Sequence, residues 1–573
     1  ENSVDPIKQR FDDAFQQITA AGAPFEIREQ DIDGEHYRVF SNAPHNLREL
    51  FAPAYQHGDK EFVIFEGERW SFARLLQLAD SIAHQLHHRH GVVKGDRVAI
   101  AMRNYPEWMA AYIAIGSINA VVVPLNSWWR AAELEYALSD AGARIVFCDR
   151  QRLDYIAPRL GALGIEAVVS RPGAEPLPEH ACSIEQFIAG AESAALPEVE
   201  IAPDDLAMML YTSGTTGNPK GAVSTHRAVC QAVVCFECCS MAGAMANPET
   251  IGAMMQAGFE PCVMLAVPLF HVSGCYSIFL LALRAGRRIV MLYKWDVQKA
   301  LELIQAERVT VLTAAPSMAM ELLESPLFER YDTRSLSSIG AGGAATPPKI
   351  GKLLLDRLEN SFAGTGWGLT ETNALGSAFV GNAFRNRPGS AGFVQPIIDL
   401  RFCDEDGQPV PDGTPGEIWV RSVTLVKEYW NRPDANAKDL RGGWFRSGDI
   451  GYLDPDGYLF LSDRAKDMVI RGGENIYPVE IESTLMDCHD VLEVVAFGVP
   501  DEKSGEEVAL LIRLREGGRI DADAVRAFLA ERLAAFKVPR HIEFTETPLP
   551  RNATHKVLKR DIRAAYLKDR GLA

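Results

Sequence analysis

Hydrophobic residues follow two periods along the first 365 positions of the chain. Short apolar runs rich in β-branched side chains predict buried strands. They alternate with stretches in which apolar residues recur every three or four positions, which predict helices. The first series places strands at 97–101, 120–123 and 144–148, and helices at 107–116 and 131–141. Because parallel strands need a crossover connection of this length, the pattern predicts a parallel sheet flanked by helices.

A second series of the same kind runs from about 205 to 365, with strands predicted at 309–313 and 336–340. From about 390, glycine and proline cluster between short runs, which predicts antiparallel strands and a small β-barrel. After Asp463 a mixed α and β pattern returns and ends in a basic helix near 557–570. The chain is therefore expected to be a multidomain α/β protein with two parallel-sheet subdomains, a small β-barrel and a C-terminal α+β unit.

One apolar stretch, Trp108 to Leu125, approaches the length of a membrane span. Ser117 and Asn119 interrupt it and Pro124 ends it, so we interpret it as an amphipathic helix, a turn and a buried strand. No transmembrane segment is expected. The Pro-, Ala- and Glu-rich segment 170–200 is expected to be a surface loop.

The composition is that of a globular protein large enough for several domains: 573 residues, 47 % hydrophobic and 23 % charged. Its 58 basic and 76 acidic residues give a net charge of −18, which argues against nucleic acid as a partner. The ten scattered cysteines do not suggest a disulfide scaffold, and the first residues show no secretory leader, so we expect a cytoplasmic protein. Homo-oligomerisation is compatible with the sequence.

The most specific signal is the segment Tyr211–Gly221, which follows an apolar strand predicted at 206–210. Its glycines let the backbone approach a ligand closely, and its hydroxyls and lysine can donate hydrogen bonds to phosphate oxygens. It differs from the Walker sequence because Pro219 precedes the lysine and Gly221 follows it. We predict a phosphate-binding loop with the residues Thr212, Ser213, Gly214, Thr215, Thr216 and Lys220.

Seven further motifs follow in order: PLFHVSG (268–274), GAGGA (340–344), GWGLTET (366–372), WFRSGD (444–449), DRAKD (463–467), GGENIY (472–477) and PRNATHK (550–556). Together with the loop, they give residues 45–565 a resemblance to the adenylate-forming superfamily. That superfamily comprises acyl- and aryl-CoA ligases, peptide-synthetase adenylation domains and beetle luciferases. The chain is most similar to fatty-acyl-CoA ligases.

The resemblance implies an N-terminal adenylation domain (1–463) and a mobile C-terminal domain (464–573). It also implies two half-reactions: a carboxylate attacks the α-phosphate of ATP and releases pyrophosphate, and a thiol then takes the acyl group from AMP. Charge builds up on phosphate oxygens, so cations and oriented donors should dominate catalysis. The 212–220 loop should hold the β- and γ-phosphates.

By the same resemblance, Thr370 should bind the α-phosphate and Glu371 should hold Mg²⁺. The turn Gly342-Gly343-Ala344 should lie against adenine, with Trp367 stacked on the base. Trp367 could instead be an ordinary residue of the hydrophobic core. Asp449 and Arg464 should bind the ribose.

Lys556 is the residue expected to bridge the attacking carboxylate and the α-phosphate. The family usually has glycine before this lysine, whereas here the residue is His555. If that position requires a positive φ, histidine costs about 1 kcal/mol relative to glycine. We expect activity to survive this change. Lys466 matches the hinge about which the small domain rotates, and Gly472 and Gly473 match the loop past which pantetheine threads.

The acid is expected to be hydrophobic. His271 stands where amino-acid-activating relatives commonly have aspartate, and the expected pocket wall is small or apolar: Val272, Gly274, Cys275, Ala374 and the strand end at 340–343. His271 could instead be a core histidine. No insertion follows the hinge, which favours CoA over a carrier protein as acceptor. A carrier-protein ligase, a nucleotide-binding protein without turnover and a luciferase-like oxygenase stay open as alternatives.

Two further patterns are discounted as metal sites. Cys235 and Cys238 form a lone CxxC, and His84 and His88 are one helical turn apart. Neither has the remaining ligands of a zinc site.

Overall fold

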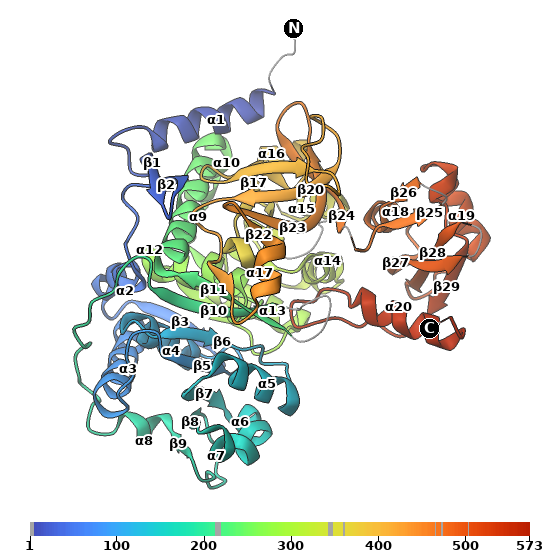
Figure 1. Ribbon diagram of the computed structural model, residues 1–573. Coiled ribbons are helices and arrows are strands. Elements are labelled where there is room, and N and C mark those ends of the chain that lie inside the picture. The colour runs from blue at the N-terminus through green and yellow to red at the C-terminus, as the bar shows by residue number, and fades with distance from the viewer. Residues whose placement is uncertain are drawn as a thin grey trace.

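The structure is a computed structural model that describes residues 5–212, 219–341, 348–358, 361–464, 466–471, 474–501 and 504–572. Figure 1 shows a large body and a smaller unit beside it. The body includes the first helix of the chain, α1 (Pro6–Thr19). Over the described residues, the body contains two long sheets and the two-stranded sheet of β1 (Ile27–Ile32) and β2 (Glu35–Phe40), and a fourth sheet forms the smaller unit.

The first sheet of the body is largely parallel. In the part of the chain that the structure describes, its order is β21 (Glu428–Tyr429), β11 (Lys220–Thr225), β10 (Leu206–Thr212), β6 (Val121–Pro124), β5 (Arg97–Ala101), β7 (Ile145–Asp149), β8 (Glu166–Ser170) and β9 (Ala181–Ser183). β5 pairs in parallel with both β6 and β7, which confirms the first predicted series. β10 and β11 are antiparallel and extend this same sheet, so the segment that begins near 205 does not start the second sheet, as the pattern had suggested.

The second sheet joins parallel and antiparallel strands. Its order over the described residues is β19 (Asp399–Cys403), β20 (Gly416–Arg421), β23 (Trp444–Leu453), β24 (Tyr458–Arg464), β18 (Gly392–Val394), β17 (Gly376–Val380), β16 (Gly364–Gly368), β15 (Ser338–Ala341), β14 (Val311–Ala314), β12 (Cys262–Leu265), β13 (Arg288–Met291), β3 (Glu61–Phe65) and β4 (Glu68–Ser71), with β22 (Leu440–Arg441) beside β23. The strands from β12 to β16 are parallel, and those from β17 to β24 are antiparallel, as predicted for the region after 390.

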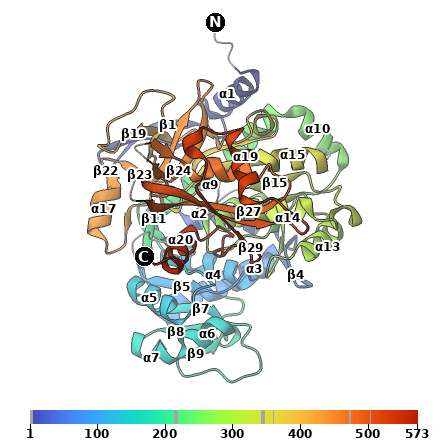
Figure 2. The same ribbon diagram turned by 90° about the vertical axis from the view of Figure 1, so that its right-hand side faces the viewer.

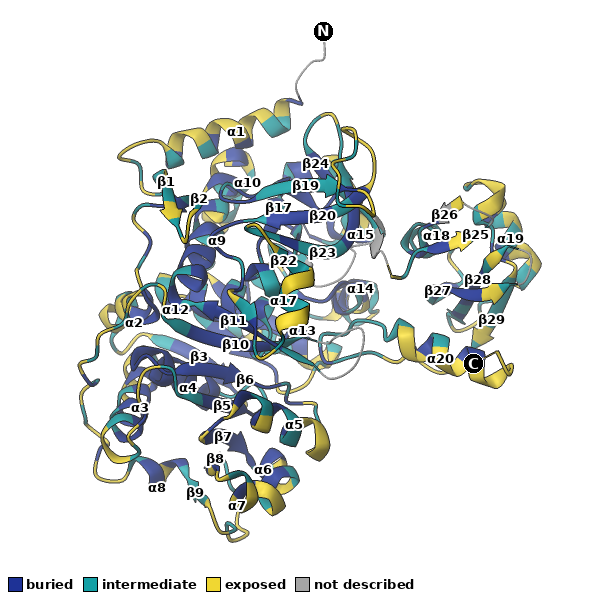
Figure 3. Ribbon diagram, viewed as in Figure 1, coloured by how far each residue is buried: buried dark blue, intermediate teal, exposed yellow. Residues whose placement is uncertain are grey.

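Helices between the sheets form the main core. One cluster of buried side chains joins a face of each sheet through α3 (Phe72–His84), α4 (Pro106–Ser117), α9 (His226–Ala246) and α12 (Leu281–Ala285). Outer helices cover the other faces: α5 (Ala131–Ala141), α6 (Arg150–Ile156) and α7 (Leu160–Leu163) on the first sheet, and α13 (Val297–Glu307), α14 (Pro316–Glu324) and α15 (Pro348–Arg357) on the second. Figure 3 shows the buried strands between these partly exposed helices.

Two expectations about single elements are corrected by this packing. α4 was expected to be amphipathic, but all of its residues are buried, because the helix lies between the sheets rather than on the surface. The segment 170–200 is not only a loop, since it contains β9 and α8 (Ile184–Ile188). The helix–turn–strand reading of 108–125 is confirmed, with Asn119 at a positive φ of 63° in the turn.

Among the described helices, α9 is long and apolar enough to cross a membrane by length and composition. More than half of its most apolar window is buried inside the protein. Its burial in the main core accounts for its composition.

The smaller unit has its own sheet, in the order β26 (Glu474–Ile476), β25 (Val469–Arg471), β28 (Gly505–Leu514) and β27 (Val491–Asp501), with β29 (His541–Thr545) beside β28. Its helices are α18 (Pro478–Leu485), α19 (Ala522–Ala530) and the basic α20 (Lys559–Asp569). The chain leaves the second sheet at Arg464 and enters this sheet at Val469, so Lys466 lies in the connection between them. Figure 2 shows the smaller unit turned toward the viewer in front of the body.

Candidate active site

The first and last residues predicted for the phosphate loop lie on two neighbouring antiparallel strands. Thr212, the last residue of β10, pairs directly with Lys220, the first residue of β11. Ser213, Gly214, Thr215 and Thr216 lie outside the described residues, as do Gly342, Gly343, Ala344, Gly472 and Gly473. The ends of the predicted loop are therefore held together by the first sheet.

Lys220 lies against a tyrosine that the motifs did not indicate. Its ammonium nitrogen is 4.1 Å from the centre of the Tyr429 ring and 3.6 Å from an Asp439 carboxylate oxygen. Tyr429 belongs to β21, which pairs with β11, and Asp439 ends α17 (Pro433–Asp439). A cation over an aromatic face is attracted by the ring quadrupole. These contacts hold the lysine at the edge of the sheet.

The same tyrosine reaches the predicted magnesium ligand. Its hydroxyl donates a hydrogen bond of 2.8 Å to Oε1 of Glu371, which lies in the short 3-10 helix η6 (Thr370–Thr372). Burial, followed by the Glu371 charge and this hydrogen bond, raises the pKa of Tyr429 well above its usual value. Tyr429 therefore stays a donor and links the lysine of the phosphate loop to Glu371.

The turn that carries Thr370 and Glu371 is fixed by a buried asparagine. Asn373 has a φ of 52°, a conformation that asparagine tolerates better than most residues. Its Oδ1 accepts a 2.7 Å hydrogen bond from the Tyr276 hydroxyl, and its Nδ2 donates to the Ser224 hydroxyl and the Thr424 carbonyl. The turn is thereby tied to β11 and to the π-helix η4 (Cys275–Leu280).

Trp367 and Asp449 meet although 82 residues separate them. The indole Nε1 donates a hydrogen bond of 2.7 Å to Oδ2 of Asp449, and the two residues are only 6 % and 7 % exposed. One face of the Trp367 ring lies against Gly376, where a Cβ would come within 2.5 Å of the ring. Asp449 also pairs across the sheet with the backbone of Arg464. The structure thus brings together the residues predicted at the base and the ribose.

His271 begins the helical segment that forms the predicted acid pocket. Its Nδ1 accepts from the backbone N–H of Ser273 at 3.3 Å and lies 2.9 Å from the Ser273 hydroxyl. Gly274 is required here, because a Cβ would lie 2.2 Å from the carbonyl oxygen of Pro268. Val272 and Cys275 are buried on the same segment. Two residues expected in the pocket wall are thus buried side by side on this segment.

Lys556 comes from the smaller unit, and its charge acts on His271 of the body. Burial, and then the positive charge of Lys556, lower the pKa of His271 to about 4, so the imidazole is neutral near pH 7. The segment with the predicted catalytic lysine therefore reaches the body beside the predicted acid pocket.

The loop before Lys556 has a defined shape. Oδ1 of Asn552 accepts hydrogen bonds from the backbone N–H groups of Thr554, at 3.0 Å, and Lys556, at 2.9 Å. Arg551 donates to the carbonyl of His555 at 2.8 Å. The φ of His555 is 60°, so the position does require the left-handed conformation for which the family uses glycine.

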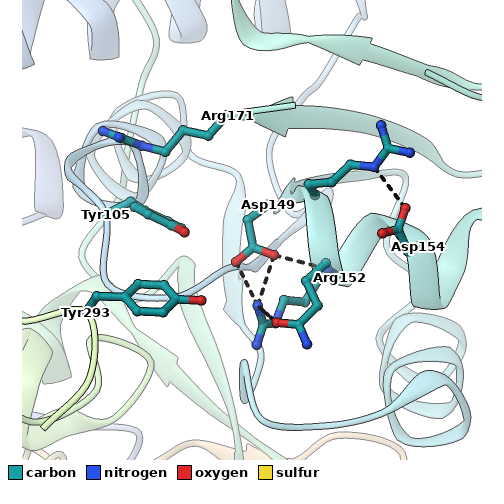
Figure 4. A pocket seen from close by; sticks show the side chains of 8 residues that line it. Tyr105, Asp149, Arg152, Asp154, Arg171 and Tyr293 are labelled. Carbon is teal, nitrogen blue, oxygen red and sulfur yellow. Dashed lines mark hydrogen bonds and ion pairs between the residues drawn. The ribbon is translucent and has the colours of Figure 1, made fainter. Parts of the chain in front are cut away.

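A separate pocket of about 270 Å³ lies at the end of β7, lined by arginines, aspartates and tyrosines (Figure 4). Its arginines have carboxylate partners: Arg152 is 3.1 Å from Asp149 in a pair that is almost fully buried, and Arg150 is 2.9 Å from Asp154. Arg171 is likewise 2.7 Å from Glu68. These three guanidiniums are paired with carboxylates, and the Asp149–Arg152 pair joins β7 to α6.

Within the described residues no group of three or more His, Cys, Asp or Glu side chains could hold a metal ion. A single carboxylate is compatible with Mg²⁺ bound mainly through nucleotide phosphates and water, because Mg²⁺ usually keeps several waters. Glu371 supplies such a carboxylate beside Lys220 and Tyr429.

The chain matches two family descriptions, "AMP-binding enzyme" over residues 50–430 and "AMP-binding enzyme C-terminal domain" over residues 480–556. It belongs to the AMP-binding enzyme family. The prediction of an adenylate-forming enzyme, an acid–thiol ligase of the AMP-forming class, is thereby confirmed.

Three relatives of this AMP-binding enzyme illustrate the match. The feruloyl-CoA synthase of Amycolatopsis sp. is 32 % identical over 541 residues, which cover 94 % of this chain and all of that protein. The long-chain-fatty-acid–CoA ligase FadD13 of Mycobacterium tuberculosis is 33 % identical over 499 residues, covering 87 % and 93 %. The crystal structure of ATP-bound MatB from Rhodopseudomonas palustris aligns with a TM-score of 0.77 at 30 % identity, covering 91 % and 99 %. The predicted multidomain α/β fold is confirmed.

Proposed function

We propose that this AMP-binding enzyme activates a hydrophobic carboxylic acid with ATP and transfers the acyl group to CoA. The observation that carries the proposal is that the charge of Lys556, from the smaller unit, acts on His271, which adjoins the buried apolar residue Val272. An ammonium group at that place can neutralise charge that develops when a carboxylate attacks a phosphate.

In the first half-reaction, a carboxylate oxygen of the acid forms a bond to the α-phosphorus of ATP, and the bond to the β-phosphate oxygen breaks. Pyrophosphate leaves and acyl-AMP forms. Thr370 and Lys556 act on the α-phosphate, and Lys220, with Thr212 and the loop after it, holds the outer phosphates. Magnesium bound at Glu371 would offset phosphate charge.

In the second half-reaction, the sulfur of CoA bonds to the acyl carbon, the bond to the AMP oxygen breaks, and the thiol proton is released to solvent. The proposed division into a body (1–463) and a mobile domain (464–573), with Lys466 as hinge, lets Lys556 withdraw before this step. Gly472 and Gly473 would then line the path of the thiol.

The polarity of the pocket supports a hydrophobic acid. His271 is neutral near pH 7, and its neighbours Val272 and Cys275 are buried and apolar. None of these three offers a charge to the tail of a polar acid. We propose a fatty acid as the first candidate. An aromatic acid is the second, because the names of the two relatives above divide between these classes.

The experiment is CoA-dependent release of AMP with a panel of acids: fatty acids of increasing length, cinnamic-type acids and, as a polar control, amino acids. We expect turnover with at least one hydrophobic acid and none with amino acids. If an acid supports pyrophosphate exchange but CoA does not stimulate AMP release, the acceptor is a carrier protein rather than CoA. ATP binding without exchange for any acid would refute it in favour of nucleotide binding alone.

A further inference from the structure

The C-terminal end of α14 carries two carboxylates that face the smaller unit. Glu321 and Glu324 are three residues apart and so lie on one side of the helix. In Figure 1, α14 lies on the side of the body that is turned toward the smaller unit. Carboxylates are disfavoured in the last turn of a helix, where the macrodipole is negative, unless cations compensate them.

The compensating cation for Glu324 comes partly from the other domain. Arg515 of the smaller unit lies 3.0 Å from one Glu324 oxygen and donates a 3.1 Å hydrogen bond to the other. Lys349, at the start of α15 in the body, lies 2.8 Å from the same carboxylate. The side chains of Arg515 and Glu324 are only 23 % and 21 % exposed, so solvent screens the pair less than an open surface pair.

Arg515 is presented by a fixed turn. It directly follows β28, its backbone N–H donates to the carbonyl of Asp490 at 2.9 Å, and its own carbonyl accepts from Gly518 at 2.9 Å. The turn fixes the backbone from which the Arg515 side chain reaches Glu324, so this contact favours one orientation of the smaller unit.

The second carboxylate of α14 is that of Glu321. It accepts a 2.8 Å hydrogen bond from Nε1 of Trp295, which holds it within the body. Its charge raises the pKa of His555, against the larger lowering effects of burial and of Arg551. Of the two carboxylates of α14, Glu324 is therefore the one with a direct contact to the smaller unit.

We propose that Glu324 and Arg515 are positioning residues: their ion pair favours the domain orientation of this structure, which we assign to acyl-AMP formation. The inference rests on the proposed function for its kinetic consequence. The pair acts through domain orientation, because no contact described by the structure joins Glu324 or Arg515 to Lys556 or His271. Losing the pair should lower the population of the orientation for acyl-AMP formation and leave the orientation for thiol transfer unaffected.

The test measures the half-reactions separately in Arg515→Gln, Arg515→Glu, Glu324→Gln and the double variant Glu324→Gln/Arg515→Gln. Pyrophosphate exchange reports acyl-AMP formation, and CoA-dependent release of AMP from supplied acyl-AMP reports thiol transfer. We expect Arg515→Glu to lower exchange about 3- to 10-fold, with thiol transfer unchanged or faster. In the double-mutant cycle, the exchange rate of Glu324→Gln/Arg515→Gln should fall no further than that of the slower single variant.

The matched control is Arg519→Glu, the same charge change at an exposed position four residues along the same segment. Small-angle X-ray scattering gives a readout without turnover: Arg515→Glu should increase the radius of gyration and Arg519→Glu should not. If the parent enzyme shows no exchange with any acid, the proposed function fails while scattering still tests the pair. Equal loss in both half-reactions, additive single effects, or scattering identical to that of Arg519→Glu would each overturn the positioning role.

Discussion

Two lysines at the candidate site are held in different ways. Lys220 belongs to the first sheet of the body, and its neighbours Tyr429 and Asp439 come from the same domain. Lys556 belongs to a loop of the smaller unit, and its charge acts on His271 of the body. The position of the first is fixed by folding alone, whereas in the proposed mechanism the second also depends on a domain rotation.

The loop around Lys556 has internal supports that do not involve the body. Asn552 holds two of its backbone N–H groups, and Arg551 links the His555 carbonyl to Glu493 of β27 through a 2.7 Å bond to its carboxylate. Such a loop can move with its domain as one piece and recover its shape whenever the domains meet again. Lys220 needs no comparable device, because its strand does not leave the sheet.

The largest expected effect separates the roles of the two lysines. Lys556→Ala should lower the rate of pyrophosphate exchange about 10²- to 10³-fold with little change in the KM for ATP, because the lost charge acts mainly in the transition state. Lys220→Ala should instead raise the KM for ATP. Initial rates across ATP concentrations measure both, with exposed Lys568→Ala as the control. Identical changes in kcat and KM for the two variants would remove the distinction.

Loop shape should account for the next largest effect. Asn552→Ala removes the acceptor of the Thr554 and Lys556 backbone N–H groups, and we expect exchange to fall about 10-fold. Asn552→Asp keeps an acceptor oxygen and should recover most of the rate. Thiol transfer from supplied acyl-AMP should stay unchanged in both variants. A fall in thiol transfer equal to that in exchange would indicate that Asn552 supports the domain as a whole.

The local pattern of hydrophobic residues predicted most helices and strands but few of the pairings between strands that are distant in the sequence. The strand and helix periods identified β5, β6 and β7 because burial repeats within a few residues. They misassigned β10 and β11, since pairing with β6 joins segments more than 80 residues apart. They also predicted an amphipathic α4, because the periodicity of one segment carries no information about the second sheet that covers the helix.

The candidate site shows the same limit. Motifs indicated Glu371 and Lys220, but Tyr429, which contacts both, lies 58 residues from one and further from the other. The polar and aromatic cluster EYWNRP at 428–433, between glycine-rich turns, is the signal that could have indicated it. At His555 the sequence left the backbone conformation open, and the φ of 60° now shows that the position uses the left-handed region.

A smaller effect tests the link between Lys220 and Glu371. Tyr429→Phe keeps the ring beside Lys220 but removes the donor to Glu371, so the ATP KM should change little while the Mg²⁺ concentration for half-maximal exchange shifts about 3-fold. Tyr452→Phe, which alters a tyrosine stacked on Phe460, is the matched control. An unchanged magnesium dependence would mean that the Tyr429 hydroxyl does not act through Glu371.

The smallest effect is expected at His555, where it tests whether the loop tolerates its departure from glycine. His555→Gly relieves a left-handed conformation that histidine tolerates better than most residues, so exchange should stay within about 2-fold of the parent. His555→Val should be clearly slower, because a β-branched residue is a genuine outlier at positive φ. Comparing the two substitutions separates backbone conformation from the imidazole, which both remove. A parent inert with every acid but revived by glycine would show that His555 disables the loop, and equal rates for glycine and valine would show that φ at this position does not matter.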